Sequence, residues 1–286
     1  MKQLADIQKI AVIGAGTMGQ GIAQLAAMAG YTTLLYDVNA NMLDKALAGI
    51  DKNLTKGIEK GKVTEEQKAA ALANVSLIES QDELIADVII EAVVERLDVK
   101  QQLFAALEKV NPSTTILATN TSSIPITRIA AGLQHPERVV GMHFFNPAHI
   151  MKLVEVISGA ATAPAVAETI FALAKQMDKV PVNAKDAPGF IVNRVARHFY
   201  VESLKVVEEQ TAGFEATDRL LEASGFRMGP FRLMDLIGVD TNYSVTDSMF
   251  HAFHQDGKFR PSRVQQQKVD AGHHGRKTGR GFYSYD

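Results

Sequence analysis

The stretch KIAVIGAGTMGQGIAQLAAMAGYTTLLYD, residues 9–37, decides the fold of this chain. Residues 9–13 are a short apolar run, residues 14–29 have the pattern of a helix, and residues 32–36 are a second apolar run. A strand, a helix and a second strand within about 30 residues form one βαβ unit. Because the strands are short and continuously apolar, the stretch predicts an α/β domain with a buried, mostly parallel sheet.

Three glycines, Gly14, Gly16 and Gly19, lie at the turn between the first strand and the helix. In a dinucleotide-binding turn the first glycine allows the tight bend, the second lets a pyrophosphate approach the backbone, and the third lets helix and strand pack closely. The helix N-terminus, with Thr17 and Met18, offers free N–H groups to phosphates. The motif predicts a Rossmann-like dinucleotide-binding domain. A turn that binds FAD, another nucleotide or nothing is the alternative.

Asp37 ends the second strand, 18 residues after Gly19. A carboxylate at this position can accept hydrogen bonds from both ribose hydroxyls of NAD, and it would repel the 2′-phosphate of NADP. Residues 38–41 contain no arginine that could accept such a phosphate. Asp37 therefore favours NAD as the cofactor.

The alternation of predicted strands and helices continues to Ala187. It includes a charge-rich pair of helices, at about residues 41–73, that we expect to protrude. Beyond Pro188 no strand is expected until the last few residues. We therefore expect two domains, residues 1–187 and a mostly α-helical domain of residues 188–286. The expected strands are 75–78, 86–90, 116–119, 139–142 and 153–157, and the expected helices of the second domain are 190–210, 216–223 and 231–253.

The composition excludes several classes of function. Lys and Arg total 30 against 32 for Asp and Glu, a net charge of −2 that argues against a general nucleic-acid binder. The chain has no cysteine, so disulfides, thiolate nucleophiles and cysteine zinc sites are excluded, as fits a cytoplasmic protein. No apolar run approaches the ~18 residues of a membrane span, and the first residues lack a signal-peptide core. The histidine spacings predict no metal site.

His143 lies at the carboxyl end of a predicted strand, the edge where open α/β sheets bind ligands. Glu155 follows twelve residues later within an apolar strand. A buried carboxylate there must find a partner or become protonated. We expect Glu155 to orient the His143 imidazole, which would act as a general base on a hydroxyl group. A packed histidine and a solvent-facing glutamate are the alternatives.

Two further polar positions are candidates for substrate contact. Ser122 follows another strand in the turn Asn120-Thr121-Ser122-Ser123, at the same predicted edge. A helix N-cap is its simpler role. Asn193 opens the helical domain and could donate to a substrate carbonyl, although an ordinary helix surface residue would look the same.

These residues resemble the L-3-hydroxyacyl-CoA dehydrogenase family, in its short 3-hydroxybutyryl-CoA form. The matching stretches follow the family order over nearly the whole chain. They are VIGAGTMGQGIAQ (12–24), EAVVERLDVK (91–100), TNTSSIPIT (119–127), GMHFFNPAHIMKLVEVI (141–157), KDAPGFIVNR (185–194), MGPFRLMDLIGVD (228–240) and GRKTGRGFY (275–283).

The resemblance implies reversible oxidation of an (S)-3-hydroxyacyl-CoA, best 3-hydroxybutyryl-CoA, to a 3-ketoacyl-CoA, with NAD accepting the hydride. It implies that His143 is the base and Glu155 its partner, that Ser122 binds the reactive oxygen near the nicotinamide, and that Asn193 completes the polar pocket. It also implies a homodimer formed through the helical domains. Four further residues would line the NAD site: Glu95, Lys100, Asn146 and Lys277. Two others would face CoA: Lys60 and Asn53.

Three other functions stay open at this point. A 3-hydroxyacid dehydrogenase of the 6-phosphogluconate type would use a lysine base on the interdomain helix, where this chain has Asn193-Arg194. A crystallin-like NAD-binding protein would have a broken His–Glu pair. A 3-hydroxyadipyl-CoA dehydrogenase would need a cation for its second carboxylate, for which Arg194, Arg197 and Arg232 are candidates.

Overall fold

The glycine-rich stretch builds the centre of an eight-stranded sheet. The structure is a computed structural model, and it describes residues 2–285. The strands are β1 (Lys9–Ile13), β2 (Thr32–Tyr36), β3 (Val75–Ile78), β4 (Val88–Glu91), β5 (Ile116–Thr119), β6 (Val139–Phe144), β7 (Leu153–Ser158) and β8 (Val180–Lys185).

The sheet has the order β3-β2-β1-β4-β5-β6-β7-β8. The first six strands run parallel, in the order of a doubly wound dinucleotide-binding sheet, and the chain reverses direction across the sheet between β1 and β4. The predicted Rossmann-like α/β fold is confirmed. Strand β7 pairs antiparallel with β6, and β8 then pairs parallel with β7. The sequence did not predict β8, because its polar residues Asn183 and Lys185 break the apolar pattern.

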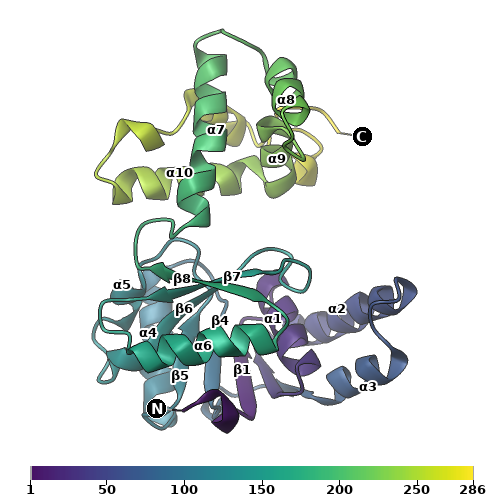
Figure 1. The fold of residues 1–286 in the computed structure, drawn as a ribbon, viewed down its shortest axis with the longest axis vertical. Helices are drawn as coiled ribbons and strands as arrows, with labels where there is room; N and C mark the ends of the chain where they lie inside the picture. Colours follow the sequence, from purple (N-terminus) through teal and green to yellow (C-terminus); the bar gives the residue numbers. More distant parts are fainter. Residues whose placement is uncertain (1, 286) are drawn as a thin grey trace. The chain divides into compact units, whose positions relative to one another are not determined.

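Helices cover both faces of the sheet. Helix α1 (Thr17–Met28), helix α2 (Ala40–Glu59) and helix α6 (Pro164–Gln176) share one apolar cluster with alternate strand residues such as Val12, Ile90 and Val140. Figure 1 shows α6 crossing in front of the strands. Helix α4 (Leu97–Val110) and the short helix α5 (Ile126–Ala130) pack on each other and cover the opposite face of the sheet.

The charge-rich segment forms the expected helical hairpin of α2 and α3 (Glu65–Ala73), which extends to one side of the sheet in Figure 1. Helix α2 is not merely appended, because its buried residues Leu43, Ile50 and Leu54 belong to the main core cluster. Its opposite face carries exposed lysines. The hairpin is therefore anchored at its base by apolar packing and presents charge to the solvent.

The chain divides after Ala187 into two compact units, and the second is helical. Its helices are α7 (Val192–Glu208), α8 (Phe214–Ala223), α9 (Pro230–Ile237), α10 (Val239–Ala252) and α11 (Arg263–Asp270). The prediction of one helix over residues 231–253 was wrong. The helix is interrupted at Gly238, whose φ of +109° is a conformation that a side chain would disfavour.

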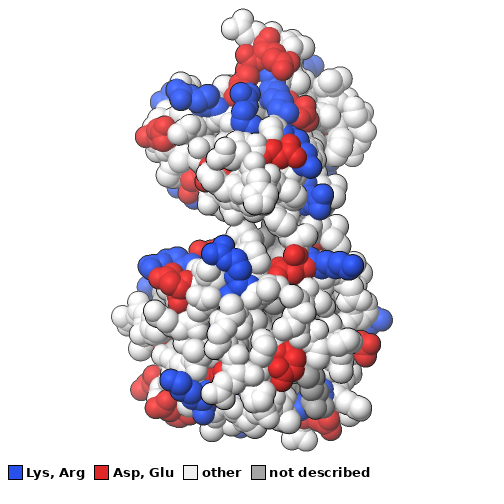
Figure 2. All heavy atoms as spheres, turned by 90° about the vertical axis from the view of Figure 1, so that its left-hand side faces the viewer, with Lys and Arg blue, Asp and Glu red and all other residues white. Residues whose placement is uncertain are grey.

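Within residues 2–285, no helix is both long and apolar enough to cross a membrane. On the face drawn in Figure 2, acidic and basic side chains are interspersed, as the net charge of −2 suggests.

Candidate active site

The glycine turn after β1 has the geometry that its sequence predicts. Gly14 has a φ of +98°, which favours glycine. A Cβ on Gly19 would lie 1.6 Å from the Gly14 carbonyl oxygen, whereas a Cβ on Gly16 would meet nothing within 4 Å. Gly16 is the N-cap of α1, so its open side lies next to the unpaired N–H groups of the first helical turn. The turn thus leaves room for a pyrophosphate at a helix N-terminus.

Asp37 follows β2 and lies beside the glycine turn. Its two carboxylate oxygens accept hydrogen bonds from the Ala15 N–H at 2.7 Å and the Asn39 N–H at 2.9 Å. A carboxylate has about four lone-pair sites, so capacity remains for ribose hydroxyls. The backbone bonds fix the carboxylate in place before any ligand arrives.

A cavity of about 560 Å³ opens where the strand order reverses, beside Gly14, Gly16 and Asp37. Its walls are mostly apolar and come from the segments that follow β1, β2 and β4, and from α4. Apolar walls suit an adenine ring, the carboxylate suits ribose, and the glycine turn suits the pyrophosphate. The residues present therefore fit NAD. Sequence reasoning missed several of the wall residues, among them Tyr36, Met42, Val93, Val99 and Leu103.

His143 and Glu155 lie directly opposite each other in the antiparallel pair β6–β7. The His143 Nδ1 and the Glu155 Oε2 are 2.7 Å apart, and the two side chains are 7% and 0% exposed. Directly opposed residues point to the same face of a sheet, which is why two residues twelve positions apart in the sequence come into contact here. The Phe145 ring packs on the imidazole with its centroid 4.5 Å away. The pairing that the sequence predicted is therefore present.

The turn after β5 carries Ser122 and is held by Glu95. The Glu95 Oε1 accepts hydrogen bonds from the backbone N–H of Ser122 at 2.9 Å and of Ser123 at 3.1 Å, and from the Thr121 hydroxyl at 2.7 Å. Burial raises the pKa of Glu95, but the Lys100 ammonium and these donors outweigh it, so the net pKa is lowered. Glu95 thus stays ionised as an internal acceptor for the turn. The Asn120 side chain ties the turn to β6 by accepting from the Phe144 N–H at 2.8 Å.

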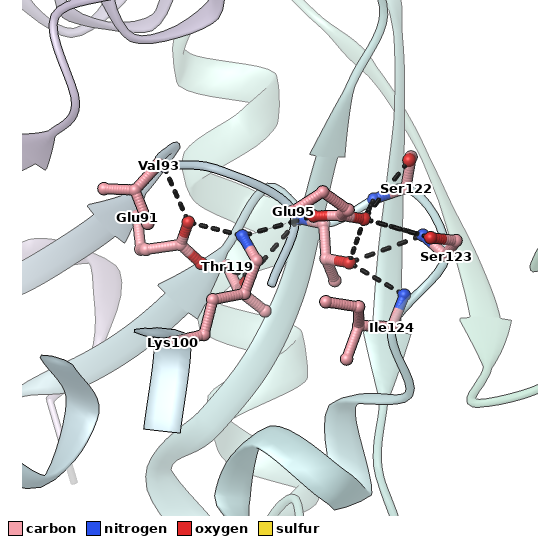
Figure 3. Close-up of polar contacts among 9 residues, drawn as sticks. Glu91, Val93, Glu95, Lys100, Thr119, Ser122, Ser123 and Ile124 are labelled. Carbon is pink, nitrogen blue, oxygen red and sulfur yellow. Dashed lines mark hydrogen bonds and ion pairs between the residues drawn. The ribbon is translucent and has the colours of Figure 1, made fainter. Parts of the chain in front are cut away.

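Lys100 lies beneath this turn, between two carboxylates (Figure 3). Its Nζ is 2.5 Å from the Glu91 Oε1 and 3.3 Å from the Glu95 Oε2. Glu91, the last residue of β4, is 0% exposed and also accepts from the Thr119 hydroxyl at 2.6 Å. Sequence reasoning missed Glu91. The available signal was a glutamate that directly ends the apolar run Val88–Ile90.

The other predicted residues lie in separate places. Asn146 is exposed in the loop after β6. Asn53 donates from its amide to the Gln24 Oε1 at 3.2 Å, while Lys60 is exposed at the end of α2. In the helical unit, Asn193 lies in the first turn of α7, and the Lys277 Nζ is 2.7 Å from Asp240.

Residues 2–285 contain no group of three or more His, Asp or Glu side chains that could hold a metal ion.

Comparison with known families agrees with this geometry. Residues 9–187 match the model of the 3-hydroxyacyl-CoA dehydrogenase NAD binding domain, and residues 189–285 match the model of the C-terminal domain of the same enzymes. The chain belongs to the 3-hydroxyacyl-CoA dehydrogenase family. It is accordingly an oxidoreductase that uses NAD.

Relatives of this dehydrogenase differ in their stated substrates. The chain is 49% identical over 284 residues to a 3-hydroxyadipyl-CoA dehydrogenase of Escherichia coli K12, covering 99% of the chain and 60% of that protein. It is 43% identical to a probable 3-hydroxybutyryl-CoA dehydrogenase of Bacillus subtilis, covering 98% of each. The chain thus spans about three fifths of the first relative and nearly all of the second.

Two solved structures have a closely similar fold. The crystal structure of (S)-3-hydroxybutyryl-CoA dehydrogenase PaaH1 from Ralstonia eutropha has a TM-score of 0.94 and 38% identity, covering 98% of this chain and 99% of that one. A 3-hydroxybutyryl-CoA dehydrogenase structure from Escherichia coli K12 gives a TM-score of 0.95 and 49% identity, covering 98% of this chain and 60% of that one.

Proposed function

We propose that this dehydrogenase reversibly oxidises (S)-3-hydroxyacyl-CoA thioesters to 3-ketoacyl-CoA, with His143 as general base and Glu155 as its orienting partner. The observation that supports this most directly is the buried 2.7 Å hydrogen bond between His143 Nδ1 and Glu155 Oε2. An ionised carboxylate only accepts hydrogen bonds, so Glu155 keeps the proton on Nδ1 and makes Nε2 the proton acceptor. The carboxylate then stabilises the imidazolium that forms.

NAD⁺, when bound, supplies the hydride acceptor at C4 of its nicotinamide. The residues of this chain would do the rest. His143 would take the proton of the 3-hydroxyl group, Ser122 would hold the reactive oxygen, and Asn193 would complete the polar pocket. General base catalysis of this kind contributes roughly 10²–10⁴-fold, and positioning of the substrate contributes further. In the reverse direction His143 returns the proton to the 3-oxygen.

For cofactor and CoA binding we keep the contacts that the family resemblance implies. Glu95, Asn146 and Lys277 would contact NAD. The exposed Lys60 at the end of α2 offers a cation for a CoA phosphate, with Asn53 on the same helix. Because the Asn53 amide is bonded to Gln24, Lys60 is the stronger of the two candidates.

The proposed acyl group is 3-hydroxybutyryl, with 3-hydroxyadipyl as a second candidate favoured by the relative that is 49% identical. A second carboxylate needs a cation. Arg197 is 3% exposed and donates to the Asn242 carbonyl and the Thr246 hydroxyl, and Arg232 pairs with Glu222. Of the three candidate arginines, Arg194 is exposed and has no carboxylate partner within residues 2–285. Its guanidinium carbon lies 5.1 Å from the centroid of the Phe253 ring.

The test is oxidation of NADH followed at 340 nm, with acetoacetyl-CoA and with 3-oxoadipyl-CoA, and repeated with NADPH. We expect fast turnover with acetoacetyl-CoA and NADH. A higher kcat/KM for 3-oxoadipyl-CoA would select the second candidate, and Arg194→Ala should then lower that value alone. Tight NADH binding without turnover of either thioester would refute the proposed reaction.

We also propose that the protein is a cytoplasmic homodimer that associates through its helical unit. This unit exposes several large apolar side chains, among them Leu220 at 67%, Phe226 at 51% and Leu236 at 49%. These exposed apolar side chains are candidates for burial in a contact between two subunits. Light scattering after size exclusion should give twice the 31.1 kDa chain mass, and Phe226→Glu should shift the protein towards the monomer.

A further inference from the structure

Glu91 is a buried acid to which the proposed reaction gives no role. It ends β4 with 0% exposure, and its ion-pair partner Lys100 is 1% exposed. Burying two charges is costly unless hydrogen bonds satisfy them. The Glu91 carboxylate receives three donors: Lys100 Nζ at 2.5 Å, the Val93 N–H at 2.8 Å and the Thr119 hydroxyl at 2.6 Å. This acid is therefore fully engaged, in a position where an apolar residue would have packed at lower cost.

Two paths of hydrogen bonds lead from Glu91 to the turn that carries Ser122. In the first, Glu91 holds the Thr119 hydroxyl, and the oxygen of that hydroxyl accepts the Thr121 N–H at 3.2 Å. In the second, Lys100 joins Glu91 to Glu95, and Glu95 accepts from the Ser122 N–H at 2.9 Å. Figure 3 shows both carboxylates on either side of the Lys100 ammonium.

The second path is asymmetric in exposure. The Glu95 side chain is 37% exposed, whereas Glu91 and Lys100 are buried. Lys100 is nearer to Glu91 by 0.8 Å, the difference between 3.3 Å and 2.5 Å. Glu91 therefore holds the Lys100 ammonium in the interior and keeps it from moving closer to Glu95.

We propose that Glu91 is a positioning residue of the dehydrogenase: through Lys100 it fixes Glu95, and through Glu95 it fixes the serine turn. This inference rests on the proposed role of Ser122 at the reactive oxygen. Lys100, expected from the sequence to line the NAD site, acts in this arrangement from beneath the turn. The carboxylate of Glu91 sets the charge of the cluster at −1, counting Glu91, Lys100 and Glu95.

Removing the Glu91 charge should displace the turn. In Glu91→Gln the ammonium keeps only Glu95 as a charged partner, so Lys100 moves towards Glu95 and draws its carboxylate away from the turn. A displacement of about 1 Å at a reacting group costs about 10²-fold in rate. We expect kcat with acetoacetyl-CoA to fall by up to about 10²-fold, while the KM for the thioester changes by less than about threefold.

The test compares Glu91→Gln, Lys100→Met and the double variant. If the effect is electrostatic, removing the ammonium as well relieves the pull on Glu95, and the double variant should recover about tenfold in kcat over Glu91→Gln. Asp98→Asn is the matched control, because Asp98 pairs with Arg96 near the start of the same helix but is 57% exposed. It should leave kcat unchanged.

Two readouts separate positioning from mere loss of stability. The deuterium isotope effect with [4-²H]NADH should rise in Glu91→Gln, because hydride transfer becomes slower relative to the other steps. Protein that is only less stable would show less active enzyme, with an unchanged isotope effect. Equal kcat loss in Glu91→Gln and in the double variant, with an unchanged isotope effect, would overturn the proposal.

A measurement without turnover keeps this inference separate from the proposed reaction. With selective ¹⁵N-serine labelling, the amide resonances of Ser122 and Ser123 should move in Glu91→Gln and stay in place in Asp98→Asn. Movement of these resonances in a chain that turns over neither thioester would support the link from Glu91 to the turn and refute the reaction alone. Unmoved resonances in an active enzyme would refute the link.

Discussion

Replacement of Glu155 by glutamine gives the sharpest test of the active site. The amide has the shape of the carboxylate, so it should pack in the same fully buried place opposite His143. What it lacks is the negative charge that faces the imidazolium formed when the base takes its proton. The variant therefore isolates an electrostatic contribution to the transition state from any change in packing.

The size of the effect follows from the geometry. The Nδ1 to Oε2 distance is 2.7 Å, which places the two charge centres about 4 Å apart. At that separation and an effective dielectric constant of about 20, the interaction is worth about 4 kcal/mol. The amide oxygen can keep a neutral hydrogen bond worth about 1 kcal/mol. The remaining loss of about 3 kcal/mol corresponds to about 10²-fold in kcat.

The assay is steady-state oxidation of NADH with acetoacetyl-CoA, with NADH affinity measured by its own fluorescence. Glu137→Gln is the matched control, because Glu137 pairs with His135 at 3.2 Å on the surface, where the side chains are 41% and 45% exposed. We expect the control to match the wild type and Glu155→Gln to bind NADH normally. A Glu155→Gln kcat within about threefold of the wild type would mean that the carboxylate does not stabilise the transition state.

Three further predictions concern the cofactor site and stability. Gly19→Ala should lower the melting temperature by several degrees, because its Cβ would lie 1.6 Å from a carbonyl oxygen, whereas Gly16→Ala should keep the stability and weaken NADH binding, measured by fluorescence titration. Asp37→Asn should lower kcat/KM for NADH by about 10–100-fold, since a charge-assisted hydrogen bond contributes about 1.5–3 kcal/mol. Burial lowers the pKa of Lys179 from 10.5 to about 8, so between these two pH values the unfolded chain binds a proton that the folded chain does not, and the free energy of unfolding rises with pH. Urea unfolding should therefore show the wild type gaining stability relative to Lys179→Met from pH 8 to 10.

Each of these has a clear contrary outcome. Equal melting temperatures for both glycine variants would contradict the close packing at Gly19, and unchanged NADH affinity in Gly16→Ala would contradict the pyrophosphate position. An unchanged preference for NADH over NADPH in Asp37→Asn would remove Asp37 from ribose recognition. A stability difference between wild type and Lys179→Met that is flat across this pH range would show that the lysine titrates as it does in the unfolded chain.

The strands of the first unit could be predicted closely because each is a short apolar run bounded by turn residues. Six of them, β1 to β3 and β5 to β7, begin where the sequence predicted. The missed strand β8 has an alternating, partly polar pattern, because it closes the edge of the sheet with one side exposed. The prediction of one helix over residues 231–253 was wrong because Gly238, at a φ of +109°, ends α9 and lets the chain change direction before α10.

The site divides in the same way. By itself the sequence determined the dinucleotide turn, the acidic residue after β2 and the presence of a histidine and a glutamate on strands, because these features are local and follow from spacing. The sequence also predicted that Glu155 pairs with His143, but only the tertiary structure shows that β7 runs antiparallel to β6 and so places the two residues directly opposite each other. It also decided that Lys100 lies between Glu91 and Glu95 beneath the serine turn. Strand direction and buried ion pairs depend on contacts between distant segments, and no local pattern of residues specifies them.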